Sequence, residues 1–144
     1  MQQLFKRFDL NRHSKLVNMQ RLFLPVLRFM PLIFWLLVAV VSVLMLIELK
    51  PSPDGISNID KLEHAFVFIM LAITGYLAYS QQKPRVYAGL IALGALYEVL
   101  QALFTVTRQA SIYDWLADIA GILITIGLMA TYRRLTKQHK VLIP

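Results

Sequence analysis

The chain has 144 residues, of which 58% are hydrophobic and only 16% are charged. Soluble domains usually contain ~45–50% apolar and ~25% charged residues, so the composition argues against a soluble protein, and the lack of cysteine excludes disulfides, thiol catalysis and cysteine-ligated metal. The net charge is +7, and its basic residues gather around apolar stretches, which is typical of membrane orientation and argues against nucleic-acid binding.

The first 29 residues are predicted to form a basic amphipathic segment. Apolar residues from Leu16 to Leu27 recur at helical spacing, with Lys15, Arg21 and Arg28 between them. Such a segment before a membrane span usually lies along the anionic inner leaflet of the bilayer. Binding of a partner protein is the less favoured alternative.

Four apolar segments follow, each close to the ~20 residues that a helix needs to cross a bilayer. We predict spans over 30–49, 60–80, 86–105 and 111–132. The chain is thereby divided into an amphipathic segment (1–29), a four-helix transmembrane domain (30–132) and a basic tail (133–144). The predicted fold is an all-α membrane protein, with four transmembrane helices in a bundle and an N-terminal cytoplasmic amphipathic helix.

The distribution of Lys and Arg orients these spans. Twelve of the fifteen basic residues lie on the side of the N-terminus, and only Lys50, Lys61 and Arg108 lie on the other side. Because cytoplasmic loops carry the excess of Lys and Arg, both termini are predicted to be cytoplasmic. We expect a multi-pass protein of the inner (cytoplasmic) membrane.

With this topology, the ionisable residues of three spans fall in one layer near the outer surface. We call them the predicted polar cluster, and its members are Asp60, Lys61, Glu63, His64, Glu98, Gln101, Arg108, Asp114 and Asp118. Placing a charged group at membrane depth costs free energy, so such groups usually face the protein interior. Spacings of three or four residues put each pair on one helix face, so the three faces can converge. Small residues on the same helices, such as Gly94 and Gly121, favour close helix packing.

Three sequence pieces carry a resemblance to a known family. Residues 60–64 read D-K-L-E-H, residues 98–101 read E-V-L-Q, and residues 108–114 read R-Q-A-S-I-Y-D, followed by a helix with Gly121. In order and spacing they resemble the D-K-x-x-H, E-x-x-Q and R-x-x-S-x-x-D signature of the VanZ-like family of small membrane proteins. The resemblance covers about residues 55–130. Asp118 departs from it, because many family members carry Asn there.

The resemblance implies an envelope protein with a link to glycopeptide susceptibility, since the family is named for a teicoplanin-resistance protein. We expect a protein that binds membrane lipids, with a lipid-linked or anionic amphiphile, such as a lipid or cell-wall-precursor head group, as its ligand. A membrane hydrolase or transferase acting on a lipid-linked substrate is the first alternative. A small transporter is the second, and it would require a homo-oligomer, since four helices are few for alternating access.

Several roles stay open at the level of residues. His64 is expected to be a hydrogen-bonded interhelical residue, and the alternative is a metal site with Glu63, Glu98 and Asp118. Glu98 either makes an interhelical contact with Arg108 or Lys61, or acts as an acid–base group or a contact to a cationic ligand. Arg108 either neutralises Asp114 or holds a phosphate. The sequence contains no recognisable nucleophile, phosphate-loop or metalloprotease motif, so we lean against an enzyme and predict no cofactor and no metal.

Overall fold

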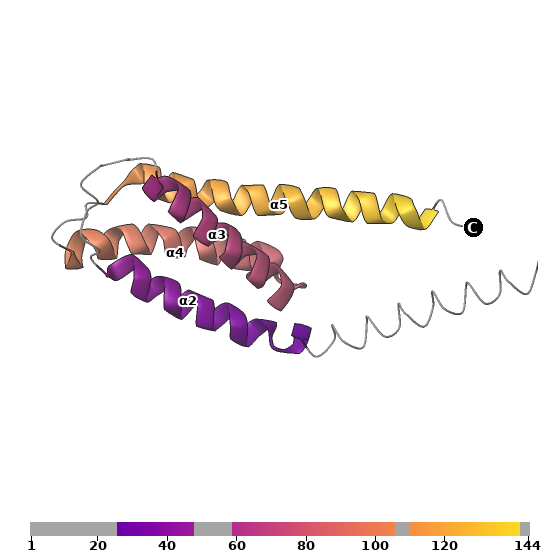
Figure 1. Ribbon diagram of the computed structural model, residues 1–144, viewed down its shortest axis with the longest axis horizontal. Coiled ribbons are helices and arrows are strands. Elements are labelled where there is room, and N and C mark those ends of the chain that lie inside the picture. Colours follow the sequence, from indigo (N-terminus) through magenta and orange to yellow (C-terminus); the bar gives the residue numbers. More distant parts are fainter. Residues whose placement is uncertain (1–25, 48–58, 106–109, 142–144) are drawn as a thin grey trace, which may run out of the picture.

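The computed structural model describes residues 26–47, 59–105 and 110–141, with side chains through residue 137 (Figure 1). These residues form four helices and no strand: α2 (Met30–Leu46), α3 (Ile59–Ala78), α4 (Lys83–Phe104) and α5 (Ile112–Val141). The predicted amphipathic helix before residue 26 lies outside the described residues. The prediction of an all-helical bundle is confirmed.

Local sequence explains several of the helix boundaries. Pro31 and Pro84 lie in the first turns of α2 and α4, where a missing N–H costs no intrahelical hydrogen bond. Ser111 caps α5, because its hydroxyl accepts the N–H of Asp114 at 3.3 Å. Helix α5 continues well past the predicted end of the last span at residue 132, into the basic tail.

Within the described parts of the chain, three helical segments are long and apolar enough to cross a membrane: Ile59–Ala78, Lys83–Phe104 and Ile112–Lys137. Helix α2 is apolar but has only 17 residues within its described bounds. At 1.5 Å per residue it rises about 26 Å, slightly less than the ~30 Å hydrocarbon core. The composition of the helices therefore agrees with a membrane protein.

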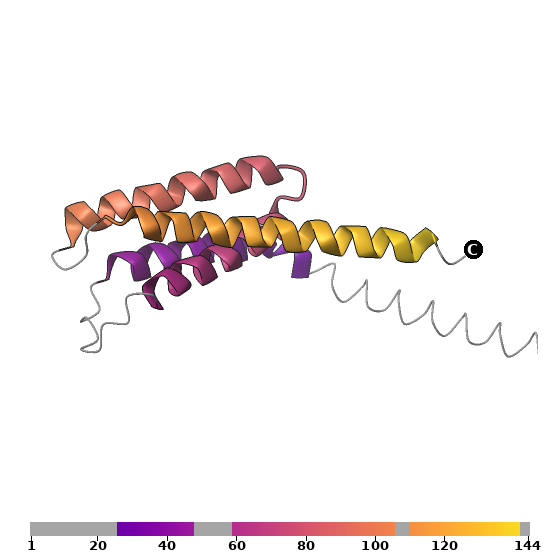
Figure 2. The same ribbon diagram turned by 90° about the horizontal axis from the view of Figure 1, so that it is seen from above.

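Helix α3 contacts the other three helices and makes its most extensive interface with α5. The C-terminal part of α5 extends beyond the rest of the bundle (Figures 1 and 2). Gly121 explains the closeness of α3 and α5, because a Cβ atom there would overlap the backbone carbonyl oxygen of Ala65. The prediction that small residues on these helices permit close approach is confirmed at this position.

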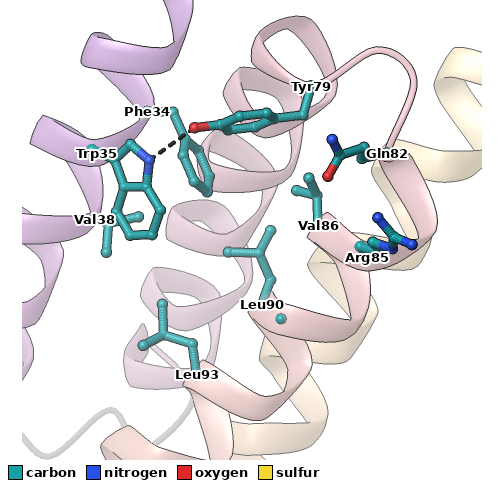
Figure 3. A pocket seen from close by; sticks show the side chains of 10 residues that line it. Phe34, Trp35, Val38, Tyr79, Gln82, Arg85, Val86, Leu90 and Leu93 are labelled. Atoms are coloured by element: carbon teal, nitrogen blue, oxygen red, sulfur yellow. Dashed lines mark hydrogen bonds between the residues drawn. The ribbon is translucent and has the colours of Figure 1, made fainter.

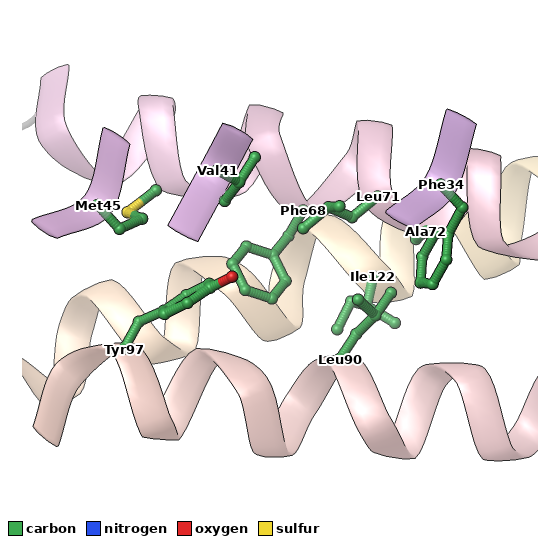
Figure 4. Close-up of a cluster of buried hydrophobic side chains, with 9 residues drawn as sticks. All are labelled: Phe34, Val41, Met45, Phe68, Leu71, Ala72, Leu90, Tyr97 and Ile122. Atoms are coloured by element: carbon green, nitrogen blue, oxygen red, sulfur yellow. The ribbon is translucent and has the colours of Figure 1, made fainter. Parts of the chain in front are cut away.

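The apolar core lies between the helices and includes Phe68 of α3 and Tyr97 of α4, which meet edge to face (Figure 4). The Tyr97 hydroxyl also lies 2.7 Å from the hydroxyl of Ser42, which connects α4 to α2. The interior contains polar residues as well, whereas large apolar side chains such as Leu103 and Phe104 are exposed. This inverted distribution is typical of a bundle whose outer surface faces lipid.

Candidate functional site

The first half of α3, the last half of α4 and the first half of α5 meet at one end of the bundle (Figure 1). Four ionisable members of the predicted polar cluster are buried there, with exposed fractions of 2% for His64, 6% for Glu98, 8% for Asp114 and 0% for Asp118. We call these four residues the buried cluster. The sequence prediction that three helices bring ionisable groups together is thus met by these four residues.

His64 and Asp118 form the centre of the buried cluster. The Nδ1 atom of His64 lies 3.0 Å from Oδ1 of Asp118, within hydrogen-bond distance. The two residues are on α3 and α5, so the pair connects the two helices that Gly121 allows to pack closely. The expectation that His64 makes an interhelical hydrogen bond is confirmed.

Glu98 joins α4 to the beginning of α5. Its Oε2 atom accepts the backbone N–H of Ser111 at 2.6 Å. The residues at the start of a helix have N–H groups without intrahelical partners, and the helix dipole favours a negative charge there. Glu98 and Asp114, which lies in the first turn of α5, both place carboxylates at this favourable position.

Three carboxylate oxygens of the buried cluster have no hydrogen-bond partner among the residues that the structure describes. They are Oε1 of Glu98, Oδ1 of Asp114 and Oδ2 of Asp118. The four residues also interact electrostatically with one another. Buried polar groups in folded proteins nearly always have partners, and an unpaired one costs roughly 1–3 kcal/mol. The arrangement is therefore suited to receive a hydrogen-bond donor or a cation.

Space for Asp118 is provided by a glycine of α4. A Cβ atom at Gly94 would lie only 2.7 Å from Oδ2 of Asp118 and 3.3 Å from both Phe68 and Trp115. Any larger residue would compete with the carboxylate for the same volume. Gly94 is therefore part of the site, because its lack of a side chain leaves room for the Asp118 carboxylate.

The buried cluster also contains a triad with the spacing of metal ligands. One side-chain atom each from His64, Glu98 and Asp118 can be chosen so that all three lie within 4.8 Å of one another. The alternative predicted from the sequence also included Glu63. That part is corrected, because Glu63 is exposed and is not a member of this group.

The other described residues of the predicted polar cluster are not members of the buried cluster. Gln101 is buried, but its amide donates to the backbone oxygen of Met45 at 2.9 Å, near the end of α2. Asp60 and Lys61 are partly buried in the first turn of α3. Arg108 lies outside the described residues, so its proposed pairing with Asp114 or a phosphate stays a prediction.

Trp115 also belongs to the site, although the predicted polar cluster did not include it. The indole N–H of Trp115 donates to the backbone oxygen of Ile91 at 3.0 Å, and its ring lies beside Gly94. Trp115 lies four residues after Ser111 and three before Asp118, so it shares a face of α5 with the residues that contact Glu98 and His64. That helical spacing was the available signal.

Two pockets lie at opposite ends of the bundle. The pocket beside the buried cluster has a volume of about 360 Å³ and is lined by Glu98, Ser111 and Trp115 together with small or apolar residues. The other pocket is slightly larger, about 410 Å³, and lies between α2 and α4 with Gln82 and Arg85 at its rim (Figure 3). In that pocket the indole of Trp35 donates to the hydroxyl of Tyr79. Of these two pockets, only the one beside the buried cluster has a member of that cluster, Glu98, in its wall.

Comparisons with known proteins add no further constraint on the site. No family model matches the chain, and no curated protein or solved structure is similar to it.

Proposed function

We propose that this chain is a VanZ-like integral membrane protein of the inner membrane, with four transmembrane helices and both termini in the cytoplasm. The three long apolar helices and the shorter α2 support the number of spans. The excess of Lys and Arg on the side of the N-terminus supports the orientation. In this orientation the buried cluster lies near the outer face of the membrane.

The proposed activity is binding of the head group of a lipid or cell-wall precursor at the pocket beside Glu98. The observation that carries this proposal is that Glu98 lines this pocket and has one of the three buried carboxylate oxygens without a partner among the described residues. Because the described site is acidic, positive charge must accompany the head group. Its source is either an amine of the head group itself or a bound cation. The guanidinium of Arg108 is chemically suited to hold the phosphate of the same head group, which is one of the two roles that the sequence leaves open for it.

Native mass spectrometry of the purified protein tests this proposal. Wild-type protein is incubated with a bacterial lipid extract and compared with Glu98→Gln and Asp114→Asn. Glu63→Gln is the matched control, because it removes an exposed carboxylate from the same layer. We expect a lipid adduct in the wild type and the control that is at least tenfold weaker in the two cluster variants. Equal adducts in all four proteins would refute a specific site.

A second candidate function is favoured by the His64–Asp118 pair. A histidine oriented by a carboxylate at 3.0 Å is a common arrangement for a general base. The protein would then be a hydrolase or transferase acting on a lipid-linked substrate, with His64 or Glu98 as the base. Release of a head group by the purified protein, abolished in His64→Gln but retained in Glu63→Gln, would establish this alternative.

The connection to glycopeptide susceptibility rests on the family resemblance. It is tested by expressing the wild type and Glu98→Gln in a susceptible host and measuring growth at graded teicoplanin concentrations. We expect a shift in the inhibitory concentration with the wild type that Glu98→Gln lacks. Identical growth of the wild-type strain and an empty-vector strain would remove this connection.

A further inference from the structure

We propose that His64, Glu98 and Asp118 form a binding site for a divalent transition-metal ion, of which Zn²⁺ and Mn²⁺ are the best suited by ligand type. The metal ion would bind at the site of the proposed function, where it would be the cation that the buried carboxylates require. Metal binding itself needs no head group. Only the role of the metal toward a phosphate rests on the proposed function.

The chemistry of the three ligands favours this class of ion. Imidazole is a common ligand of zinc, iron and nickel, and carboxylates add affinity for manganese and zinc. Two ionised carboxylates and a neutral imidazole carry a charge of −2, which a divalent cation balances. Without such balance, two carboxylates buried together would repel each other strongly.

The distances agree with one shared ion. The three candidate ligand atoms lie within 4.8 Å of one another. Ligands bound at about 2.1 Å to one metal ion are separated by roughly 3–4 Å, depending on the geometry. If each of two ligand atoms moves by less than about 1 Å, a separation of 4.8 Å shortens to the range expected for one shared ion. The ligands come from α3, α4 and α5, so the packing of three helices fixes their arrangement.

The unpaired oxygens are an independent indication. Oε1 of Glu98 and Oδ2 of Asp118 are buried and lack a partner, although each residue has a hydrogen bond through its other oxygen. A purely structural network would be expected to satisfy these oxygens within the protein. Asp114 contributes a third unpaired oxygen next to the triad. That oxygen is suited to accept a hydrogen bond from a water molecule on the metal.

A metal held by three protein ligands keeps a coordination position open. In zinc proteins, three protein ligands with one position left for water or substrate are typical of sites that act on a ligand. Glu98 is at once a member of the triad and part of the wall of the 360 Å³ pocket. An anionic head group entering this pocket would therefore reach the metal through a phosphate oxygen. The metal ion would thereby allow a site lined by carboxylates to bind an anionic amphiphile.

Metal titration of the full-length protein tests the inference. Protein purified in detergent without a polyhistidine tag is stripped with a chelator and titrated with Zn²⁺ in competition with a chromophoric indicator. We expect one equivalent of Zn²⁺ per chain in the wild type. We expect at least about tenfold weaker binding in Asp118→Asn, Glu98→Gln and His64→Gln, and wild-type affinity in Glu63→Gln. Absence of saturable binding by the wild type would overturn the inference, as would equal losses in Glu63→Gln and Asp118→Asn.

A second measurement uses the wild-type protein alone, so its result does not depend on whether the variants fold. Co²⁺ is added to the stripped wild-type protein, and its visible absorption spectrum is recorded. We expect intense d–d bands typical of a site of low coordination number, which Zn²⁺ displaces. A spectrum identical to that of aqueous Co²⁺ would overturn the inference without reference to any variant.

Failure of this inference and failure of the proposed function give different results. The metal titration uses no lipid, and the lipid experiment is repeated with a chelator present. Zn²⁺ binding without a lipid adduct would leave the metal site standing and remove head-group binding. A lipid adduct that persists unchanged with chelator, together with no Zn²⁺ binding, would remove the metal site and leave an amine as the cationic group.

Discussion

Replacing Gly94 by alanine should disturb the buried cluster without touching any of its ionisable groups. The added methyl carbon would lie 2.7 Å from Oδ2 of Asp118, well inside an ordinary carbon–oxygen contact of about 3.3 Å. Phe68 and Trp115 each lie 3.3 Å from the same position, so they also crowd the methyl group. The Asp118 carboxylate must therefore move by about 0.6 Å.

That movement determines the expected cost. If the carboxylate moves away from His64, their hydrogen bond lengthens from 3.0 Å to about 3.6 Å, at which distance it no longer counts as a hydrogen bond. Overpacking a well-packed core typically costs about 1–3 kcal/mol, and loss of a hydrogen bond to a charged group falls in a similar range. The two costs describe the same displacement and are not added. We expect the free energy of unfolding of Gly94→Ala to be about 1–3 kcal/mol lower than that of Gly89→Ala, a substitution of the same kind on the same helix.

The assay is reversible unfolding of the detergent-solubilised protein by sodium dodecyl sulfate, followed by circular dichroism. Gly89→Ala is the matched control, because Gly89 is on the same helix and nothing lies within 4 Å of its added Cβ. Alanine gains up to about 1 kcal/mol of helix propensity over glycine, and both variants share this gain. If Gly94→Ala is as stable as Gly89→Ala, the tight contact between α4 and Asp118 does not exist as described.

Three further predictions use the same approach. Gly121→Ala should lose about 1–3 kcal/mol relative to Gly127→Ala in the same unfolding assay, because its methyl meets the α3 backbone, whereas nothing lies near Gly127; equal stabilities would contradict this. Gln101→Leu should lose about 0.6–1.7 kcal/mol through the missing bond to α2, and an unchanged midpoint would contradict it. In a chain without cysteine, an impermeant maleimide should label Ala110→Cys in intact cells and Gln81→Cys only after permeabilisation, and the reverse result would invert the topology.

Much of the fold could be predicted from the sequence because its signals are local. Apolar length alone predicts the helices, and the prolines and Ser111 mark where three of them begin. The convergence of polar residues at one end also follows from local information. When consecutive helices alternate in direction, polar residues at the start of α3, the end of α4 and the start of α5 necessarily share one end of the bundle.

The composition of the site was less accessible from the sequence. Asp60, Glu63 and His64 all lie within the first two turns of α3, and all are polar. Only His64 of these three is fully buried, because the rotation of α3 about its axis turns that side chain toward α5. Similarly, Glu98 and Gln101 share a helix face, yet Glu98 meets the start of α5 and Gln101 meets α2. The two residues have different partners because different helices pack against them, and their spacing in the sequence does not predict this.

The sequence by itself determined the helical class, the apolar lengths and the end of the bundle at which ionisable groups gather, because hydrophobicity and helical periodicity act over a few turns. Only the tertiary structure decided which of those groups face one another. The close approach of α3 and α5 at Gly121 brings His64 to Asp118, and the missing side chain of Gly94 makes room for that carboxylate. These contacts depend on helix rotation and crossing distance, which steric fit between residues far apart in the chain decides.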